Sequence, residues 1–80
     1  MVRIKSVIPK ENYTLLLTFT DGSRGVFDVK PYLEKGSVFR ELKNVALFKG
    51  VKASRGTIEW PNGADLCPDC VHINTNFASV

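Results

Sequence analysis

The sequence predicts an α+β fold in which an N-terminal three-stranded antiparallel meander, a short helical segment and a C-terminal antiparallel β-meander follow one another. Apolar and polar residues alternate with a period of two over residues 2–30 and again over 51–66, a pattern typical of strands with one buried face. Gly-containing turn signals interrupt both stretches. Residues 31–48 lack the alternation and carry apolar residues at helical spacing.

The first meander is predicted from a strand at residues 2–8, a turn at 9–12 and a strand at 13–19. A three-residue loop at 20–22, with Gly22 in the left-handed conformation, then returns the chain as a third strand. This register keeps one face of the sheet apolar. It pairs Leu17 with Gly25, Leu15 with Phe27 and Tyr13 with Val29.

The helical segment is predicted in three short pieces. Residues 30–36 hold at most one helical turn, with Pro31 at its start. Ser37 is the expected N-cap of a helix over 38–43, and residues 45–48 form a further turn. A helix of this length is stable only when it docks on other elements. Its expected inward-facing side chains are Val38, Phe39, Leu42, Val45 and Ala46.

Residues 58–69 hold the single Trp of the chain and its clearest turn signal. Residues 60–63 fit a type I turn closed by a left-handed Gly63, which is the usual three-residue hairpin loop. Pairing across this loop puts Ile58, Trp60, Ala64 and Leu66 on one apolar face. The residues that we take as the structural signature of the chain are Trp60, Pro61, Asn62, Gly63, Asp65 and Asp69.

The opposite face of this hairpin is predicted to be polar. A two-residue turn at Arg55-Gly56 sets Lys52 beside Glu59, and the next turn sets Glu59 beside Asp65. Two acids therefore share one cation. Either this face is only solvated, or Glu59, Asp65 and Lys52 are partner-binding residues.

Cys67 and Cys70 form a C-x-x-C motif. At a helix N-terminus, Cys67 would have a lowered pKa and Cys70 could resolve a mixed disulfide. As metal ligands, the two thiols and His72 fall one short of a closed tetrahedral zinc site. Only one helical turn is predicted over residues 67–72, so the strand-and-helix context of a redox motif is missing. We expect ordinary thiols and no metal or cofactor.

Length and composition favour one small globular domain. We place the domain at residues 1–73 and a C-terminal tail, either flexible or bound to a partner, at 74–80. A chain of 80 residues buries roughly 60% of its unfolded surface, so a partner or a second copy would add stability. The N-terminus lacks the apolar core of a signal peptide, and no apolar run reaches membrane-spanning length. We expect a cytoplasmic protein without membrane contact.

Neither catalysis nor nucleic-acid binding is predicted. The sequence has no nucleophile elbow and no Gly-rich phosphate loop, so we expect no enzyme activity. Eleven Lys and Arg against eight acids give a net charge of +3, which we attribute to solubility. Basic residues from Arg3 to Arg55 could contact nucleic acid, but the aromatic residues that would stack on bases fall on the expected core face.

Residues 58–69 read Ile-Glu-Trp-Pro-Asn-Gly-Ala-Asp-Leu-Cys-Pro-Asp, and the pattern extends back to residues 13–22, Phe27-Asp28, the helix at 39–42 and Phe48. Over roughly residues 2–72 this resembles the signature of the bacterial domain-of-unknown-function family 2442. The resemblance implies a small α+β domain without known catalytic residues, often encoded beside another small protein in a toxin–antitoxin-like pair. The two Cys depart from the family pattern.

These observations together predict a small non-enzymatic protein-binding module. The resemblance favours the antitoxin-like half of a bacterial two-protein pair, with a small protein, or a second copy of this chain, as the partner. A thiol redox or metal-binding protein that uses Cys67 and Cys70 is the alternative hypothesis. Nucleic-acid binding by a basic face is a weaker one.

Overall fold

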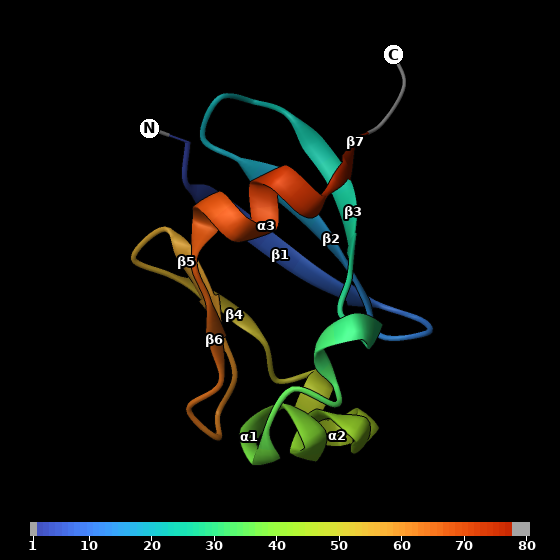
Figure 1. The fold of residues 1–80 in the computed structure, drawn as a ribbon. Coiled ribbons are helices and arrows are strands. Elements are labelled where there is room, and N and C mark those ends of the chain that lie inside the picture. The colour runs from blue at the N-terminus through green and yellow to red at the C-terminus, as the bar shows by residue number, and fades with distance from the viewer. Residues whose placement is uncertain (1, 78–80) are drawn as a thin grey trace.

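The computed structural model describes residues 2–77 and arranges them as two antiparallel sheets connected by a helical segment (Figure 1). The first sheet has the order β1 (Ile4–Lys10), β2 (Thr14–Phe19), β3 (Arg24–Asp28) and β7 (Asn76–Phe77). The second contains β4 (Lys52–Ser54), β5 (Thr57–Glu59) and β6 (Asp65–Leu66). The helical elements are η1 (Lys30–Tyr32), α1 (Ser37–Arg40), η2 (Glu41–Lys43), α2 (Val45–Phe48) and α3 (Pro68–Asn74). The predicted α+β class is confirmed.

The hairpin between β2 and β3 has the predicted register. Leu15 lies opposite Phe27, and Leu17 lies opposite Gly25. The loop closes where the Phe19 N–H donates to the Ser23 carbonyl at 2.8 Å, with Gly22 at φ +89°. The apolar side of β2 is consequently buried in the core.

The turn between β1 and β2 lies at residues 11–13, so the prediction of a turn at 9–12 was wrong. Pro9 and Lys10 belong to β1 and pair with Leu15 and Thr14. A proline fits here because β1 is an edge strand, where a missing N–H costs no ladder hydrogen bond. The chain reverses instead through two left-handed residues, Asn12 at φ +58° and Tyr13 at φ +57°.

The helical segment differs from the prediction in its caps and in its buried face. Gly36, at φ +126°, occupies the N-cap position, and Ser37 is the first residue of α1. The α-helix gives way to the 3-10 turn η2, and a new N-cap forms at Asn44, whose side chain accepts a hydrogen bond from the Ala46 N–H at 3.0 Å. Because a 3-10 turn has fewer residues per turn than an α-helix, apolar residues at α-helical spacing no longer fall on one face. Phe39 and Leu42 face inward as predicted, whereas Val38, Val45 and Ala46 are exposed.

The second sheet is built as predicted. Arg55 and Gly56 form the two-residue turn, at φ +53° and +81°. The three-residue loop closes where the Trp60 N–H donates to the Ala64 carbonyl at 2.8 Å, with Gly63 at φ +93°. The resulting cross-strand pairs are Lys52 with Glu59, Ala53 with Ile58, Ile58 with Leu66, and Glu59 with Asp65.

The C-terminal part is more ordered than predicted. Helix α3 spans seven residues instead of one turn, and it lies against the inner face of the first sheet, where His72 contacts Phe19 of β2. Beyond the expected boundary at residue 73, β7 pairs with β3 of the same chain. Residues 76–77 of the tail, which was expected to be flexible or bound to a partner, therefore extend the chain's own sheet. Residues 78–80 of the expected tail lie outside the described residues.

One hydrophobic core joins the inner faces of both sheets with the helices. It contains Ile4, Leu15, Leu17, Phe19, Phe27, Val29, Leu33, Leu42, Phe48, Val51, Ile58, Trp60, Ala64, Leu66 and Val71. Within residues 2–77, no helix is long and apolar enough to cross a membrane.

Candidate functional site

The signature residue Trp60 fastens the second sheet to the helical segment. Its side chain is buried, and Nε1–H donates to the Phe48 carbonyl at the end of α2, at 3.0 Å. Its ring contacts Phe39 of α1 at a centroid distance of 6.4 Å and Phe48 at 6.3 Å. The residue therefore has a structural role.

Asn62 and Pro61 complete this attachment. The Asn62 side-chain amide donates to the Val38 carbonyl at 2.9 Å and to Glu41 Oε1 at 2.7 Å, while its oxygen accepts from the Ala64 N–H at 3.1 Å. Pro61 lies so close to Gly50 that a Cβ at that glycine would meet Pro61 Cγ at 2.8 Å. The turn at residues 60–63 is thus a clamp between the hairpin and the helices.

The remaining signature acids lie on the surface. Asp65 of β6 and Asp69 in the first turn of α3 are both exposed. Asp69 stands where the helix dipole favours a negative charge. Asp65 makes no contact with the clamp among the interactions of the described residues.

The structure brings Lys52, Glu59 and Asp65 together on the outer face of the second sheet, as the sequence predicts. Lys52 Nζ lies 3.7 Å from Glu59 Oε1, and Asp65 lies on the other side of Glu59. Beside them is a polar hollow of about 420 Å³, lined also by Arg55. The ion pair is exposed and contributes on the order of 0–1 kcal/mol to stability. Solvation accounts for this arrangement as well as binding does.

Cys67 and Cys70 are exposed thiols at the beginning of α3. The nearby backbone N–H of Cys70, and then its thiol, favour the thiolate and lower the pKa of Cys67 below the ordinary cysteine value. The same thiol contact raises the pKa of Cys70, as does the negative charge of Cys67. Cys67 is therefore deprotonated more readily than Cys70.

His72 does not join the two thiols. Its ring packs edge-on against Phe19, with 4.8 Å between centroids and an interplanar angle of 90°. Within residues 2–77, no group of three or more His, Cys, Asp or Glu side chains is arranged to hold a metal ion. His72 thus does not complete a set of metal ligands with the two thiols.

Phe19, Phe27 and Trp60 are not accessible for stacking on bases, whereas Tyr13 is half-buried and lies beside Lys10 and Lys49. Arg3 donates through Nη1 to the Arg55 carbonyl at 3.2 Å, next to the turn that joins β4 to β5. The aromatic side chains Phe19, Phe27 and Trp60 are buried in the core. Stacking of bases on these rings would require the core to open.

The outer face of the first sheet carries an apolar row that the sequence reading did not single out. Ile8, Leu16 and Val26 are cross-strand neighbours on β1, β2 and β3, and they point away from the core. Ile8 is 49% exposed and Val26 is 40% exposed. Polar rows flank them on both sides: Ser6, Thr18 and Arg24 on one, and Lys10, Thr14 and Asp28 on the other. The predicted register of β2 and β3 already placed Leu16 beside Val26, so the sequence contained the information needed to find part of this row.

Comparison with protein families identifies the family that the sequence resembles. A family model described as a protein of unknown function (DUF2442) matches residues 4–71. The chain belongs to this family. The match includes strands β1 to β6, the helical segment and the clamp, and it ends within α3. Neither the curated proteins nor the solved structures contain a significant match to the chain.

Proposed function

We propose that this protein is a small non-enzymatic protein-binding module that binds a small protein partner through the outer face of its first sheet. The observation that carries the proposal is the row of Ile8, Leu16 and Val26, which is apolar and accessible although the sheet is otherwise well packed. An apolar patch with a polar border is typical of protein-interaction surfaces.

The energetics of this face favour a partner. Full burial of a Val or Ile side chain is worth about 1.5–3 kcal/mol, so covering the exposed halves of Ile8 and Val26 would contribute roughly 1 kcal/mol each. The flanking charges of Lys10, Arg24 and Asp28 would then determine which partner fits, because unmatched charges at an interface are costly.

The biological form that we propose is a two-protein pair in which this chain is the neutralising, antitoxin-like half. The family resemblance supports this form. A module that acts by covering another protein needs an accessible surface and no catalytic groups of its own.

Affinity capture from an extract of the native host tests the proposal, with tagged wild-type protein and the double variant Ile8→Lys/Val26→Lys as paired baits. We expect one small protein in stoichiometric amount on the wild type and its loss on the variant. Ile73→Lys is the matched control, because Ile73 is an exposed apolar residue of α3 at 79% exposure. This control should capture as well as the wild type.

Two results would contradict the proposal. One is the absence of both a stoichiometric partner and self-association. The other is a partner that the double variant retains, which would place the binding surface elsewhere. Circular dichroism of the baits shows that a loss of capture does not come from unfolding.

A second candidate function, thiol–disulfide exchange, is favoured by the opposed pKa shifts of Cys67 and Cys70. In this reaction the Cys67 thiolate attacks a disulfide such as oxidised glutathione and releases one thiol. Cys70 then attacks the mixed disulfide and releases the second thiol, which leaves a Cys67–Cys70 disulfide. The two electrons pass to the attacked disulfide.

The pH profile of this exchange distinguishes a tuned pair from two ordinary thiols. Because its folded pKa is lowered, Cys67 should reach half-maximal reactivity at lower pH than in the unfolded chain. Cys70→Ala removes the neighbouring thiol and should move this midpoint up, while Cys67→Ser should abolish the reaction that begins at this midpoint. A midpoint that is equal in folded and unfolded protein would exclude this function.

A further inference from the structure

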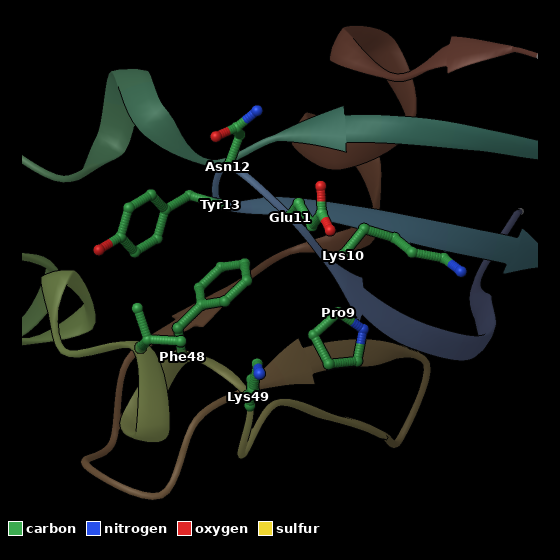
Figure 2. A pocket seen from close by; sticks show the side chains of 8 residues that line it. Pro9, Lys10, Glu11, Asn12, Tyr13, Phe48 and Lys49 are labelled. Atoms are coloured by element: carbon green, nitrogen blue, oxygen red, sulfur yellow. The ribbon is translucent and has the colours of Figure 1, made fainter.

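A second hollow, of about 390 Å³, lies between the β1–β2 turn and helix α2 (Figure 2). The rings of Tyr13 and Phe48 form one side of it, 5.3 Å apart and nearly perpendicular at 76°. Pro9 and Val45 add further apolar surface. Ligand-binding pockets commonly have volumes of about 300–1,000 Å³ and an apolar lining.

Contacts with the core and with η2 fix the two aromatic rings that line the hollow. Phe48 is almost completely buried, its ring contacts Trp60, and its carbonyl accepts the Trp60 indole N–H at 3.0 Å. The Tyr13 hydroxyl donates to the Lys43 carbonyl of η2. The two rings are therefore fixed before any ligand arrives, which lowers the entropy cost of binding.

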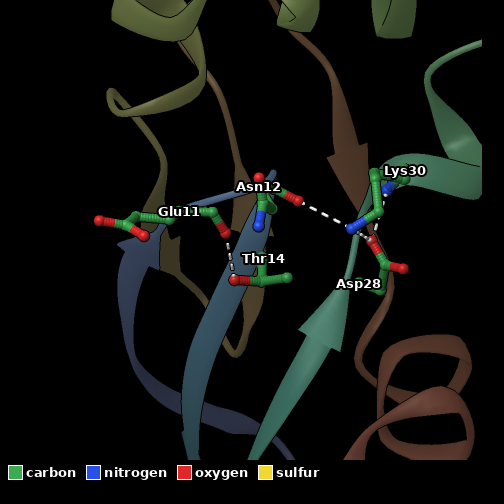
Figure 3. A network of polar contacts seen from close by, with 5 residues as sticks. All are labelled: Glu11, Asn12, Thr14, Asp28 and Lys30. Carbon is green, nitrogen blue, oxygen red and sulfur yellow. Dashed lines mark hydrogen bonds and ion pairs between the residues drawn. The ribbon is translucent and has the colours of Figure 1, made fainter.

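The β1–β2 turn, which carries Tyr13, is held by polar contacts (Figure 3). Lys30 Nζ donates to the Asn12 carbonyl at 2.9 Å and lies 3.0 Å from Asp28 Oδ1, while Thr14 Oγ1 donates to the Glu11 carbonyl at 2.7 Å. Tyr13 in the left-handed region costs roughly 1–2 kcal/mol, and the preceding Asn12 costs less because asparagine tolerates this conformation. Such strain tends to be kept where a site needs a fixed backbone.

The charge at the rim is positive. Lys10 and Lys49 both line the hollow, with Glu11 as the single acid beside them. Within residues 2–77, neither of these two ammonium groups belongs to an ion pair, in contrast to Lys30, Lys43 and Lys52. An anion could therefore pair with them without displacing a partner.

We propose that this hollow binds a small organic carboxylate with an aromatic body. The body lies against Tyr13, Pro9 and Val45, and the carboxylate lies near Lys10 and Lys49. This site shares only Lys10 with the border of the apolar row on the first sheet, so it adds ligand binding to the protein-binding function. Ligand binding is tested on the isolated protein, so its outcome does not depend on whether the protein partner exists.

The test compares 3-phenylpropionate with its neutral amide, 3-phenylpropanamide, by ¹H–¹⁵N NMR titration of the full chain. We expect the carboxylate to shift the amide signals of Asn12, Tyr13, Val45 and Lys49, and to bind several-fold more tightly than the amide. The preference should shrink in high salt, because the lysines are exposed.

Variants separate the two halves of the site. Lys10→Gln/Lys49→Gln should lower carboxylate affinity to that of the amide, by about threefold for each exposed lysine removed, and leave amide binding unchanged. Lys5→Gln, an exposed lysine of the same strand that does not line the hollow, is the matched control and should change neither. Val45→Asn should weaken both ligands.

The proposal is overturned by the absence of shifts with either compound up to ~10 mM, the weak limit for a ligand of this size. Equal affinity for acid and amide would also overturn it, as would shifts that map away from the turn and α2. An unchanged preference for the carboxylate in the Lys10→Gln/Lys49→Gln variant would overturn the proposal as well.

Discussion

Asn62 shows why one amide side chain is needed in the clamp. It must donate to the Val38 carbonyl and to Glu41 Oε1 while its oxygen accepts from the Ala64 N–H. An aspartate keeps the acceptor but loses the donor, and it places a second carboxylate against Glu41. A glutamine is too long for the same geometry. At this scale the signature is explained by hydrogen-bond chemistry.

Asn62→Asp should lower the free energy of unfolding by about 1–2 kcal/mol, since two hydrogen bonds are lost and like charges meet. The measurement is chemical denaturation at neutral pH. Glu41→Gln supplies a donor in place of the carboxylate, so the double variant should recover part of the loss. If Asn62→Asp is as stable as the wild type, the clamp does not depend on this amide.

The structure groups some of the candidate site residues as the sequence predicts and separates others, for physical reasons. Lys52, Glu59 and Asp65 were correctly brought together because a two-residue and a three-residue turn fix their register. His72 was grouped with the thiols by sequence proximity, yet its ring packs on Phe19. The hollow beside Tyr13 depends on contacts between residues far apart in sequence, such as Tyr13 with Lys43, and the local pattern does not contain them.

At the scale of elements, two of the hairpin loops end in the same way. The loops at residues 20–22 and 61–63 are closed by Gly22 and Gly63, at φ +89° and +93°. A Cβ at either position would meet nothing within 4 Å, so the requirement for glycine comes from the backbone and not from crowding.

Gly63→Ala should therefore cost roughly 1–2 kcal/mol of stability, the penalty of a left-handed backbone for an ordinary residue. Gly63→Asn should cost less, because asparagine tolerates this conformation. Thermal or urea unfolding of both variants measures the difference. Equal losses would indicate that the new side chain clashes and that backbone conformation is not the cause.

Hairpins were predicted better than helices because their signals differ in range. Side-chain alternation and turn chemistry determine a hairpin register locally, as Leu15 with Phe27 and Glu59 with Asp65 illustrate. The short helices depend on competing caps, and Asn44 starts a new helix that turns Val45 outward. The length of α3 and the pairing of β7 with β3 depend on packing against the first sheet. The residues that meet there are far apart in sequence, since Val26 pairs with Asn76, 50 residues later.

At the scale of the whole molecule, a chain of aromatic contacts links the first sheet to the clamp. Rings meet in sequence from Phe27 to Tyr32, Phe39, Trp60, Phe48 and Tyr13, with centroids 5.3–6.4 Å apart. The two sheets also meet directly where the Ile4 N–H donates to the Gly56 carbonyl at 2.9 Å. The interior therefore forms one unit, and the outer face of the first sheet remains for binding.

Hydroxyl-radical footprinting of the protein, free and bound to the captured partner, tests the use of this face most directly. Ile8, Leu16 and Val26 should lose much of their labelling in the complex, whereas Ile73 on α3 should label equally in both states. Unchanged labelling of the apolar row, together with new protection near Glu59 and Asp65 or at α3, would contradict the account.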